Sequence, residues 1–174
     1  MGDVGYESVL LKYDYTESDD DLNRIAYYRF RSKKSNLFYI VRVEEYREHV
    51  YGVKFYLKKM QNSPRKYSYI TNTFEPRVIV LTVFKLLKEI LRMDALASFL
   101  FIGNADEGGT HENTRRYRLY CRLVENYISE VYFQHIRNDA HSLYILANRS
   151  QVVKNESFSD MLVERFVERF IFDM

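Results

Sequence analysis

The sequence predicts an α+β domain: a mainly antiparallel sheet with about three helices packed on one face, in the order β-β-β-(β)-α-β-α-β-β-α. Three observations favour this class. Aromatic and β-branched residues dominate the first third of the chain, apolar residues recur at helical spacing in the middle, and a hairpin pattern precedes an amphipathic helix at the end. The 174 residues suit one domain, 1–174, in which an N-terminal segment with an acidic turn, 1–24, leads into the core, 25–174.

Three strands are expected early in the core, at residues 27–31, 37–43 and 51–59. The third strand alternates between two faces, with Val53, Phe55 and Leu57 on one and Lys54, Tyr56 and Lys58 on the other. This alternation predicts antiparallel strands that keep one face in contact with water. Pro64 ends the third strand, and a short fourth strand is allowed at 67–71.

The clearest helix begins at Pro76, which suits a first helical turn because the missing N–H is not needed there. Its apolar residues recur every three or four positions: Ile79, Val80, Val83, Phe84, Leu87, Ile90 and Leu91. A buried strand at 97–103 follows, and then a second helix at 113–129. A hairpin that turns at Asn138 and Asp139 and a third helix at 159–172 complete the order.

Composition limits the function classes. A formal charge of +2 gives no global basic field of the kind that marks binders of nucleic acid or anionic membranes. The single cysteine, Cys121, excludes an internal disulfide and fits a reducing compartment. No segment looks like an export signal or approaches the ~20 apolar residues of a membrane span. We therefore expect a cytoplasmic protein with no membrane contact, and the sequence predicts no cofactor and no metal site.

The segment GNADEGGTHENTRRYRLY, residues 103–120, is the candidate ligand site. Its arginines open a helix, where free backbone N–H groups carry partial positive charge, so a cation there needs a negative neighbour. For Arg116 that neighbour is either internal, from Asp106, Glu107 or Glu112, or an external phosphate or carboxylate. The residues that would hold an external anion are Gly108, Gly109, Thr110, Thr114, Arg115, Arg116, Arg118 and Tyr120. The glycine spacing matches neither the P-loop nor the dinucleotide-binding fingerprint.

Residues 78–126 also carry a family-like motif. An apolar helix that contains Thr82 is followed by a short strand, a glycine loop and RRYRLYCR. This succession resembles an uncharacterised bacterial family of small proteins in which a strand ends in a glycine-containing loop and the next helix opens with an Arg-x-Arg-Leu-Tyr motif. The motif is matched by Arg116, Arg118, Leu119 and Tyr120, whereas Cys121 stands where the family has a basic residue. The resemblance draws attention to Arg116 and Tyr120 and implies no reaction.

Catalytic arrangements are less favoured than binding. Cys121 could pair with His135 or His141, but a lone cysteine on the buried side of a helix is usually a small hydrophobic residue. Asp106, His111 and Glu112 could act as acid and base or bind a metal. Neighbouring polar residues in a loop are, however, more often solvated than catalytic or metal-ligating. The common hydrolase and metallonuclease motifs are missing from the sequence.

Nucleic acid is a partner that the sequence allows but does not favour. Basic and aromatic residues alternate in the early strands, and such a face can stack bases and neutralise phosphates. The same alternation keeps an exposed sheet face soluble, and the net charge is near zero, so we expect a solvated face. The residues concerned are Tyr27, Arg29, Arg31, Lys33, Lys34, Lys54, Tyr56, Lys58 and Lys59.

The sequence thus favours a non-catalytic regulatory protein that acts through a protein partner or as a homo-oligomer, in the setting of a phage, defence or toxin–antitoxin locus. The apolar end of the chain is expected to dock on the chain's own core, and its alternative role is that of the candidate partner interface, at Phe170, Ile171 and Phe172. Binding of a phosphate ligand or nucleic acid through residues 103–122 is the second hypothesis. An enzyme is the third.

Overall fold

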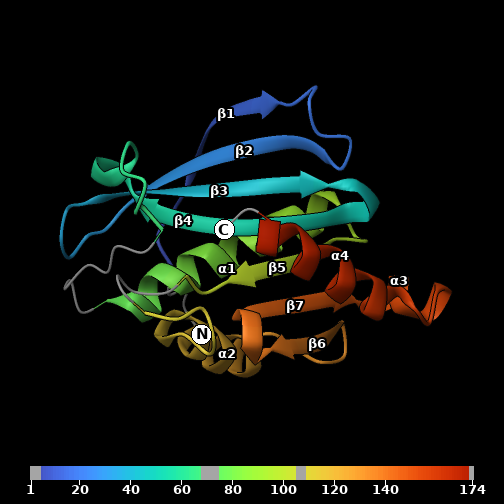
Figure 1. Cartoon of the computed structure of the whole chain (residues 1–174). Coiled ribbons are helices and arrows are strands. Elements are labelled where there is room, and N and C mark those ends of the chain that lie inside the picture. Colours follow the sequence, from blue (N-terminus) through green and yellow to red (C-terminus); the bar gives the residue numbers. More distant parts are fainter. Residues whose placement is uncertain (1–4, 68–74, 105–108, 173–174) are drawn as a thin grey trace.

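The structure is a computed structural model that describes residues 5–67, 75–104 and 109–172. Seven strands form one sheet in the order β1-β2-β3-β4-β5-β7-β6 (Figure 1). The strands are β1 (Val9–Tyr15), β2 (Leu22–Arg31), β3 (Phe38–Tyr46), β4 (Val50–Leu57), β5 (Ser98–Ile102), β6 (Phe133–Asn138) and β7 (Leu143–Asn148). The helices are α1 (Pro76–Met93), α2 (Arg115–Tyr127), α3 (Arg149–Lys154) and α4 (Phe158–Phe172). Short 3-10 turns follow β3, β4 and β6: η1 (Arg47–His49), η2 (Lys58–Met60) and η3 (Asp139–His141).

The sheet is antiparallel except at one junction. β4 and β5 pair in parallel, and all other neighbouring strands are antiparallel. A parallel pair needs a crossover connection, and α1 supplies it. The α+β class and the mainly antiparallel sheet expected from the sequence are therefore confirmed.

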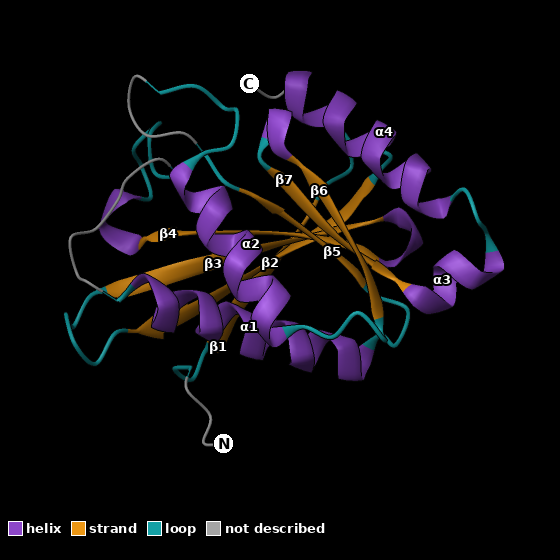
Figure 2. Ribbon diagram, turned by 90° about the horizontal axis from the view of Figure 1, so that it is seen from below, coloured by secondary structure: helices purple, strands orange, loops and turns teal. Residues whose placement is uncertain are grey.

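Helices cover both faces of the sheet, whereas the sequence analysis expected them on one. Figure 2 shows the sheet between α4 on one side and α1 with α2 on the other. The larger core lies under α1 and α2, and the smaller one lies under α4, where Leu162 and Phe166 are fully buried. The sequences of β5 and β7 explain the difference. In both strands, SFLFI and LYILAN, the residues that point to either face of the sheet are mostly apolar. Strands of this kind need a cover on both faces.

The N-terminal segment contains a strand that the sequence analysis did not expect. β1 pairs with β2 at the edge of the sheet, and its register shifts between Leu10 and Lys12. Val9, Leu10 and Leu11 are 58%, 41% and 45% exposed, so β1 lacks the alternation that marks a half-buried strand. The allowed strand at 67–71 lies, apart from Tyr67, outside the described residues.

The acidic turn between β1 and β2 is docked rather than simply solvated. Asp19 accepts a hydrogen bond from Arg169 of α4 at 2.6 Å, and Arg165 of the same helix pairs with Asp21. The bond from Arg169 is the main cause that lowers the pKa of Asp19. The first hairpin and the last helix are therefore held together by charge-assisted hydrogen bonds.

Candidate functional site

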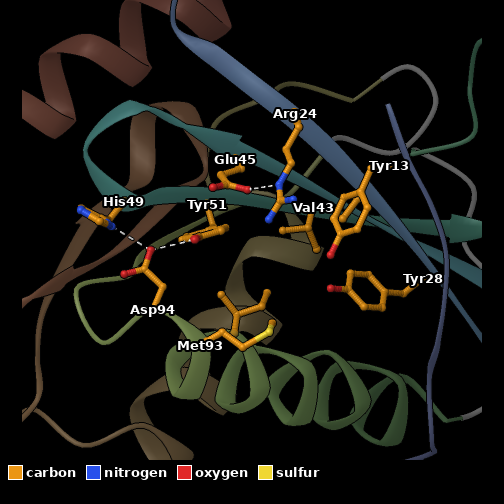
Figure 3. Close-up of a pocket in the computed structure, with 11 residues that line it drawn as sticks. Tyr13, Arg24, Tyr28, Val43, Glu45, His49, Tyr51, Met93 and Asp94 are labelled. Atoms are coloured by element: carbon orange, nitrogen blue, oxygen red, sulfur yellow. Dashed lines mark hydrogen bonds and ion pairs between the residues drawn. The ribbon is translucent and has the colours of Figure 1, made fainter. Parts of the chain in front are cut away.

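A pocket of about 390 Å³ lies between the sheet and the C-terminal end of α1 (Figure 3). It is lined by Tyr13, Arg24, Ala26, Tyr28, Val43, Glu45, His49, Tyr51, Ile90, Met93 and Asp94. The volume falls within the roughly 300–1,000 Å³ of small-molecule sites. β1, β2, β3, β4 and α1 all contribute, so the pocket exists only once the sheet and its crossover helix have assembled.

One wall is a cross-strand ion pair. Arg24 of β2 and Glu45 of β3 are register partners, and Arg24 Nε lies 2.5 Å from Glu45 Oε2. The guanidinium carbon of Arg24 lies 4.3 Å from the centre of the Tyr13 ring, so β1 adds a cation–π contact. The hydrogen bond to Glu45 is the main cause that raises the pKa of Arg24. Arg24 is thus a fixed positive charge beside a carboxylate.

Asp94 organises the neighbouring wall, because Tyr51, which bonds to it, is the cross-strand partner of Glu45. Its Oδ2 accepts a hydrogen bond from the Tyr51 hydroxyl at 2.7 Å and lies 2.9 Å from His49 Nδ1. Burial alone would raise the pKa of Asp94, but the bonds from Tyr51 and His49 hold it below its usual range. Burial and the bond to Asp94 raise the pKa of Tyr51. At neutral pH this wall therefore holds an ionised carboxylate and a neutral phenol.

The turn that presents His49 has an uncommon backbone. Glu48 and His49 both adopt positive φ values, 65° and 61°, in the left-handed region that disfavours residues other than glycine. Each such residue costs on the order of 1 kcal/mol and persists because the surrounding contacts hold it. The bond from His49 to Asp94 is one of these contacts. Strain of this kind often occurs at binding sites.

The rest of the pocket combines phenols with an apolar floor. Tyr13 and Tyr28 line one side, opposite His49, Tyr51 and Asp94 (Figure 3). The apolar floor is formed by Ala26, Val43 and Ile90, and Met93 lies at the rim with 74% of its surface exposed. Burial raises the pKa of Tyr28, so its hydroxyl stays protonated and can donate. The pocket offers hydrogen-bond donors and acceptors around an apolar surface, as ligand sites do.

Sequence reasoning missed this site. Arg24 and Glu45 lie 21 residues apart, and His49 and Asp94 lie 45 apart. Each falls in a stretch that is unremarkable by itself: a strand, a turn and the end of a helix. No local motif signals their convergence, since it depends on strand register and on where α1 ends.

The predicted site at residues 103–120 is described in part. Gly108 lies outside the described residues, and Gly109 and Thr110 are exposed in the loop. Thr114 is buried at the start of α2, where its hydroxyl oxygen accepts from the Tyr117 N–H and its hydroxyl donates to the Gly103 carbonyl at 2.6 Å. Gly103 is required for this contact, because a Cβ there would lie 2.4 Å from the Tyr117 nitrogen. Thr114 and Gly103 therefore fasten α2 to the end of β5.

The arginines and the tyrosine of α2 point to different surroundings. Arg115 is exposed, Arg118 donates to the Asn113 carbonyl at 2.5 Å, and Arg116 donates to the Tyr67 carbonyl. Tyr120 is buried, with the rings of Phe55 and Phe101 at 6.1 and 6.3 Å. Arg115 and Tyr120 thus do not share one surface. Of the expected internal partners of Arg116, Asp106 and Glu107 lie outside the described residues.

The predicted partner interface at the C-terminal end is also described in part. The backbone of Ile171 and Phe172 belongs to α4, and their side chains are outside the described set. Phe170 is half-buried and packs on the smaller core, with its ring 6.1 Å from that of Phe166. It also lies 5.7 Å from Lys54 Nζ. Part of the Phe170 side chain is therefore buried on the chain's own core. The role of the C-terminal end as a partner interface stays a prediction.

Cys121 and the described histidines near it form no catalytic pair. Cys121 is buried, and burial raises the pKa of its thiol. His135 Nδ1 lies 2.6 Å from the Tyr144 hydroxyl, and His141 Nδ1 lies 3.0 Å from Asn138 Oδ1. Among the described residues, no group of three or more histidine, cysteine, aspartate or glutamate side chains could hold a metal ion.

Comparisons with known proteins find no match to a family model, to a curated protein or to a solved structure. The resemblance to a bacterial family therefore rests only on the sequence pattern of residues 78–126. Within the described part of the chain, no helix is both long enough and apolar enough to cross a membrane.

Proposed function

We propose that this protein is a non-catalytic binding protein whose pocket takes a small amine and whose bound state regulates a protein partner. The observation that carries the proposal is the arrangement in Figure 3: two carboxylates, each held by partners, face an apolar floor between tyrosine side chains. Such a site is preorganised, because its polar groups are already oriented before a ligand arrives.

The charge balance favours a ligand with a cationic end. Glu45 and Asp94 contribute two carboxylates, whereas Arg24 contributes the one guanidinium of the lining, so the carboxylates outnumber the permanent cation. An ammonium group would add a second cation beside Asp94 and can also lie against a tyrosine face. The body of the ligand would cover Ala26, Val43 and Ile90.

The residues of the pocket support binding over covalent chemistry. Its described lining contains no serine, threonine, cysteine or lysine, and its two carboxylates are held in bonds to Arg24, Tyr51 and His49. The imidazole of His49 is held by Asp94, an arrangement that also orients a hydrogen bond to a ligand.

β1 supports the partner part of the proposal. This edge strand supplies Tyr13 to the pocket and exposes Val9, Leu10 and Leu11 at the end of the sheet. An exposed edge can accept a further strand from another chain. A ligand that contacts Tyr13 would stabilise β1, and with it the edge that a partner strand would use.

The ligand is tested with two probes that share one ring. Tyramine carries an ammonium group, and 4-hydroxyphenylacetate carries a carboxylate in its place. We expect tyramine to raise the melting temperature and the acid to leave it unchanged. Asp94→Asn keeps the shape of the pocket but removes the charge, so it should weaken tyramine binding about tenfold in calorimetry. The matched control is Asp160→Asn, an exposed aspartate of α4. Equal responses to both probes, or unchanged binding by Asp94→Asn, would contradict the proposal.

The partner is tested separately by purification of the tagged chain from its own host, followed by sizing with light scattering. A stoichiometric protein partner that is lost in Leu11→Lys would support the β1 edge. Loss of the partner on deletion of residues 170–174, with Leu11→Lys still bound, would instead assign the interface to the C-terminal end. A chain that is monomeric and alone in every preparation would contradict the partner part.

A further inference from the structure

The face of the sheet turned away from α1 is only partly covered. In Figure 1, α4 lies beside β4, β5 and β7, and it also packs on Leu22 and Ile25 of β2 and on Tyr46 of β3, whereas the opposite ends of β2 and β3 extend beyond it. We call the remaining surface of β2, β3 and β4 the open half-face. Arg29, Arg31 and Phe38 form its outer end, and Tyr27, Arg42 and Lys54 form a partly buried inner row. It lies on the side of the sheet opposite the pocket, so it is independent of the proposed amine site.

Strand register sets these side chains in rows. Tyr27, Arg42 and Lys54 are partners across three strands and form the first row. Arg29 belongs to the second row, beside the buried Ile40 and Tyr56, and Arg31 pairs with Phe38 in the third. Alternate residues of a strand face the same side about 7 Å apart, so the rows present aromatic and cationic groups in repeating succession.

The open half-face has an excess of positive charge. Among the described residues, Glu44 is the carboxylate that forms ion pairs with the cations of the open half-face. It lies 2.9 Å from Lys54 and 3.8 Å from Arg42. Its side chain is 5% exposed, so it lies beneath the cations and does not offset the exposed ones.

Lys66 and Lys58, in the segment that follows β4, add to this charge. Lys66 has a lowered pKa because of burial and because Arg42 and Lys54 repel its charged form. Like charges that destabilise one another in the free protein provide a site for an anion.

Aromatic rings lie among these cations. Phe38 is 37% exposed, and its ring centre lies 5.0 Å from Arg29, 5.5 Å from Arg31 and 5.8 Å from Lys58. Lys66 lies 4.7 Å from the ring of Tyr56. An unpaired base can stack on a ring or on a guanidinium plane while neighbouring cations neutralise the phosphates.

We propose that the open half-face binds single-stranded nucleic acid, with Phe38 as the stacking group and Arg29, Arg31 and Lys58 as phosphate contacts. A double helix keeps its bases paired and cannot use the rings in this way. Backbone charge and stacking carry no base-specific readout, so the surface binds with little sequence preference.

The test is fluorescence anisotropy with labelled oligo-dT and oligo-U of about 12 nucleotides at about 50 mM salt. We expect the full chain to bind, and R31E/K58E to weaken binding at least about tenfold, because two phosphate contacts become repulsive. Both residues are exposed, so this variant should fold. The matched control, K88E/R92E, makes the same charge change on the exposed side of α1 and should stay within about twofold of the wild type.

F38A separates stacking from simple attraction, and we expect it to weaken binding about fivefold without a change of charge. Absence of binding by the wild type, or equal losses in R31E/K58E and K88E/R92E, would overturn the proposal. So would a duplex probe that binds as tightly as oligo-dT and is insensitive to F38A. Because the amine test uses the opposite face, failure here leaves that test unaffected.

Discussion

Two halves of one sheet face have opposite chemistry. Under α4, Leu100, Ile145 and Phe166 are at most 1% exposed and belong to a dry core. In the open half-face, Arg42 and Lys54 project from the same side of the sheet. The difference lies in the cover, because a helix excludes water from apolar side chains, whereas cations are stable where water or a counter-charge reaches them.

The boundary between the halves lies at the end of α4. Phe170 packs on the smaller core and also approaches Lys54. Glu44 accepts a hydrogen bond from the Tyr46 hydroxyl at 2.8 Å. The Tyr46 ring in turn packs edge-on against the Phe166 ring, with the ring centres 5.0 Å apart. The two halves are thus linked by Tyr46, and substitutions on either side of it test how each half is stabilised.

The largest effect is expected in the dry half. Phe166→Ala should lower the free energy of unfolding by about 3–5 kcal/mol, since it removes a fully buried ring and leaves a cavity. Chemical denaturation measures this change. Val153→Ala is the control: Val153 is 83% exposed on α3, and its change should stay within about 0.5 kcal/mol. A loss below about 1 kcal/mol in Phe166→Ala would show that α4 contributes little packing energy.

An intermediate effect is expected at Glu44. Glu44→Gln keeps the shape but leaves Arg42 and Lys54 without a counter-charge. We expect a loss of about 2 kcal/mol, below the roughly 3–5 kcal/mol of a fully buried pair, because both cations remain partly exposed. Glu45→Gln, whose pair with Arg24 is more exposed, should cost less. The reverse order would contradict this account of the charged half.

The same substitution should change the pH dependence of stability. Burial alone would raise the pKa of Glu44, but Lys54 and Arg42 hold it below its usual range. A carboxyl group whose pKa is lower in the folded than in the unfolded protein stabilises the fold at pH values above its unfolded pKa. This stabilisation is lost as the pH falls below roughly 4. Between neutral pH and pH 3, stability of the wild type should therefore fall more steeply than that of Glu44→Gln. Parallel curves would show that Glu44 is not coupled to these cations.

The smallest effect should have the opposite sign. Burial and repulsion by Arg42 and Lys54 lower the pKa of Lys66, so its charged form is disfavoured in the folded protein. Lys66→Gln should therefore stabilise the fold by up to about 0.5 kcal/mol. The loss of the contact between Lys66 and the Tyr56 ring acts in the opposite direction and reduces this gain. Lys88→Gln on α1 is the control and should be neutral. Destabilisation by Lys66→Gln would mean that the ring contact outweighs the repulsion.

Sequence patterns predicted most elements but not their surroundings. Pro76 begins α1 as expected, and the hairpin of β6 and β7 turns at Asn138 and Asp139. β1 was missed because its exposed leucines break the alternation of a half-buried strand. The pocket was missed because its charged walls combine residues that are isolated in the sequence.

The sequence by itself determined where most strands and helices form and which side of each is apolar, because periods of two and 3.6 residues are local properties of the chain. Only the tertiary structure decided that α4 covers one half of its sheet face and that Arg42 and Lys54, which stay partly exposed, lie at its edge. It also decided that Arg24 meets Glu45 and that His49 meets Asp94. Such meetings depend on strand register and on the packing of helices, which are set by the whole core and not by any single segment.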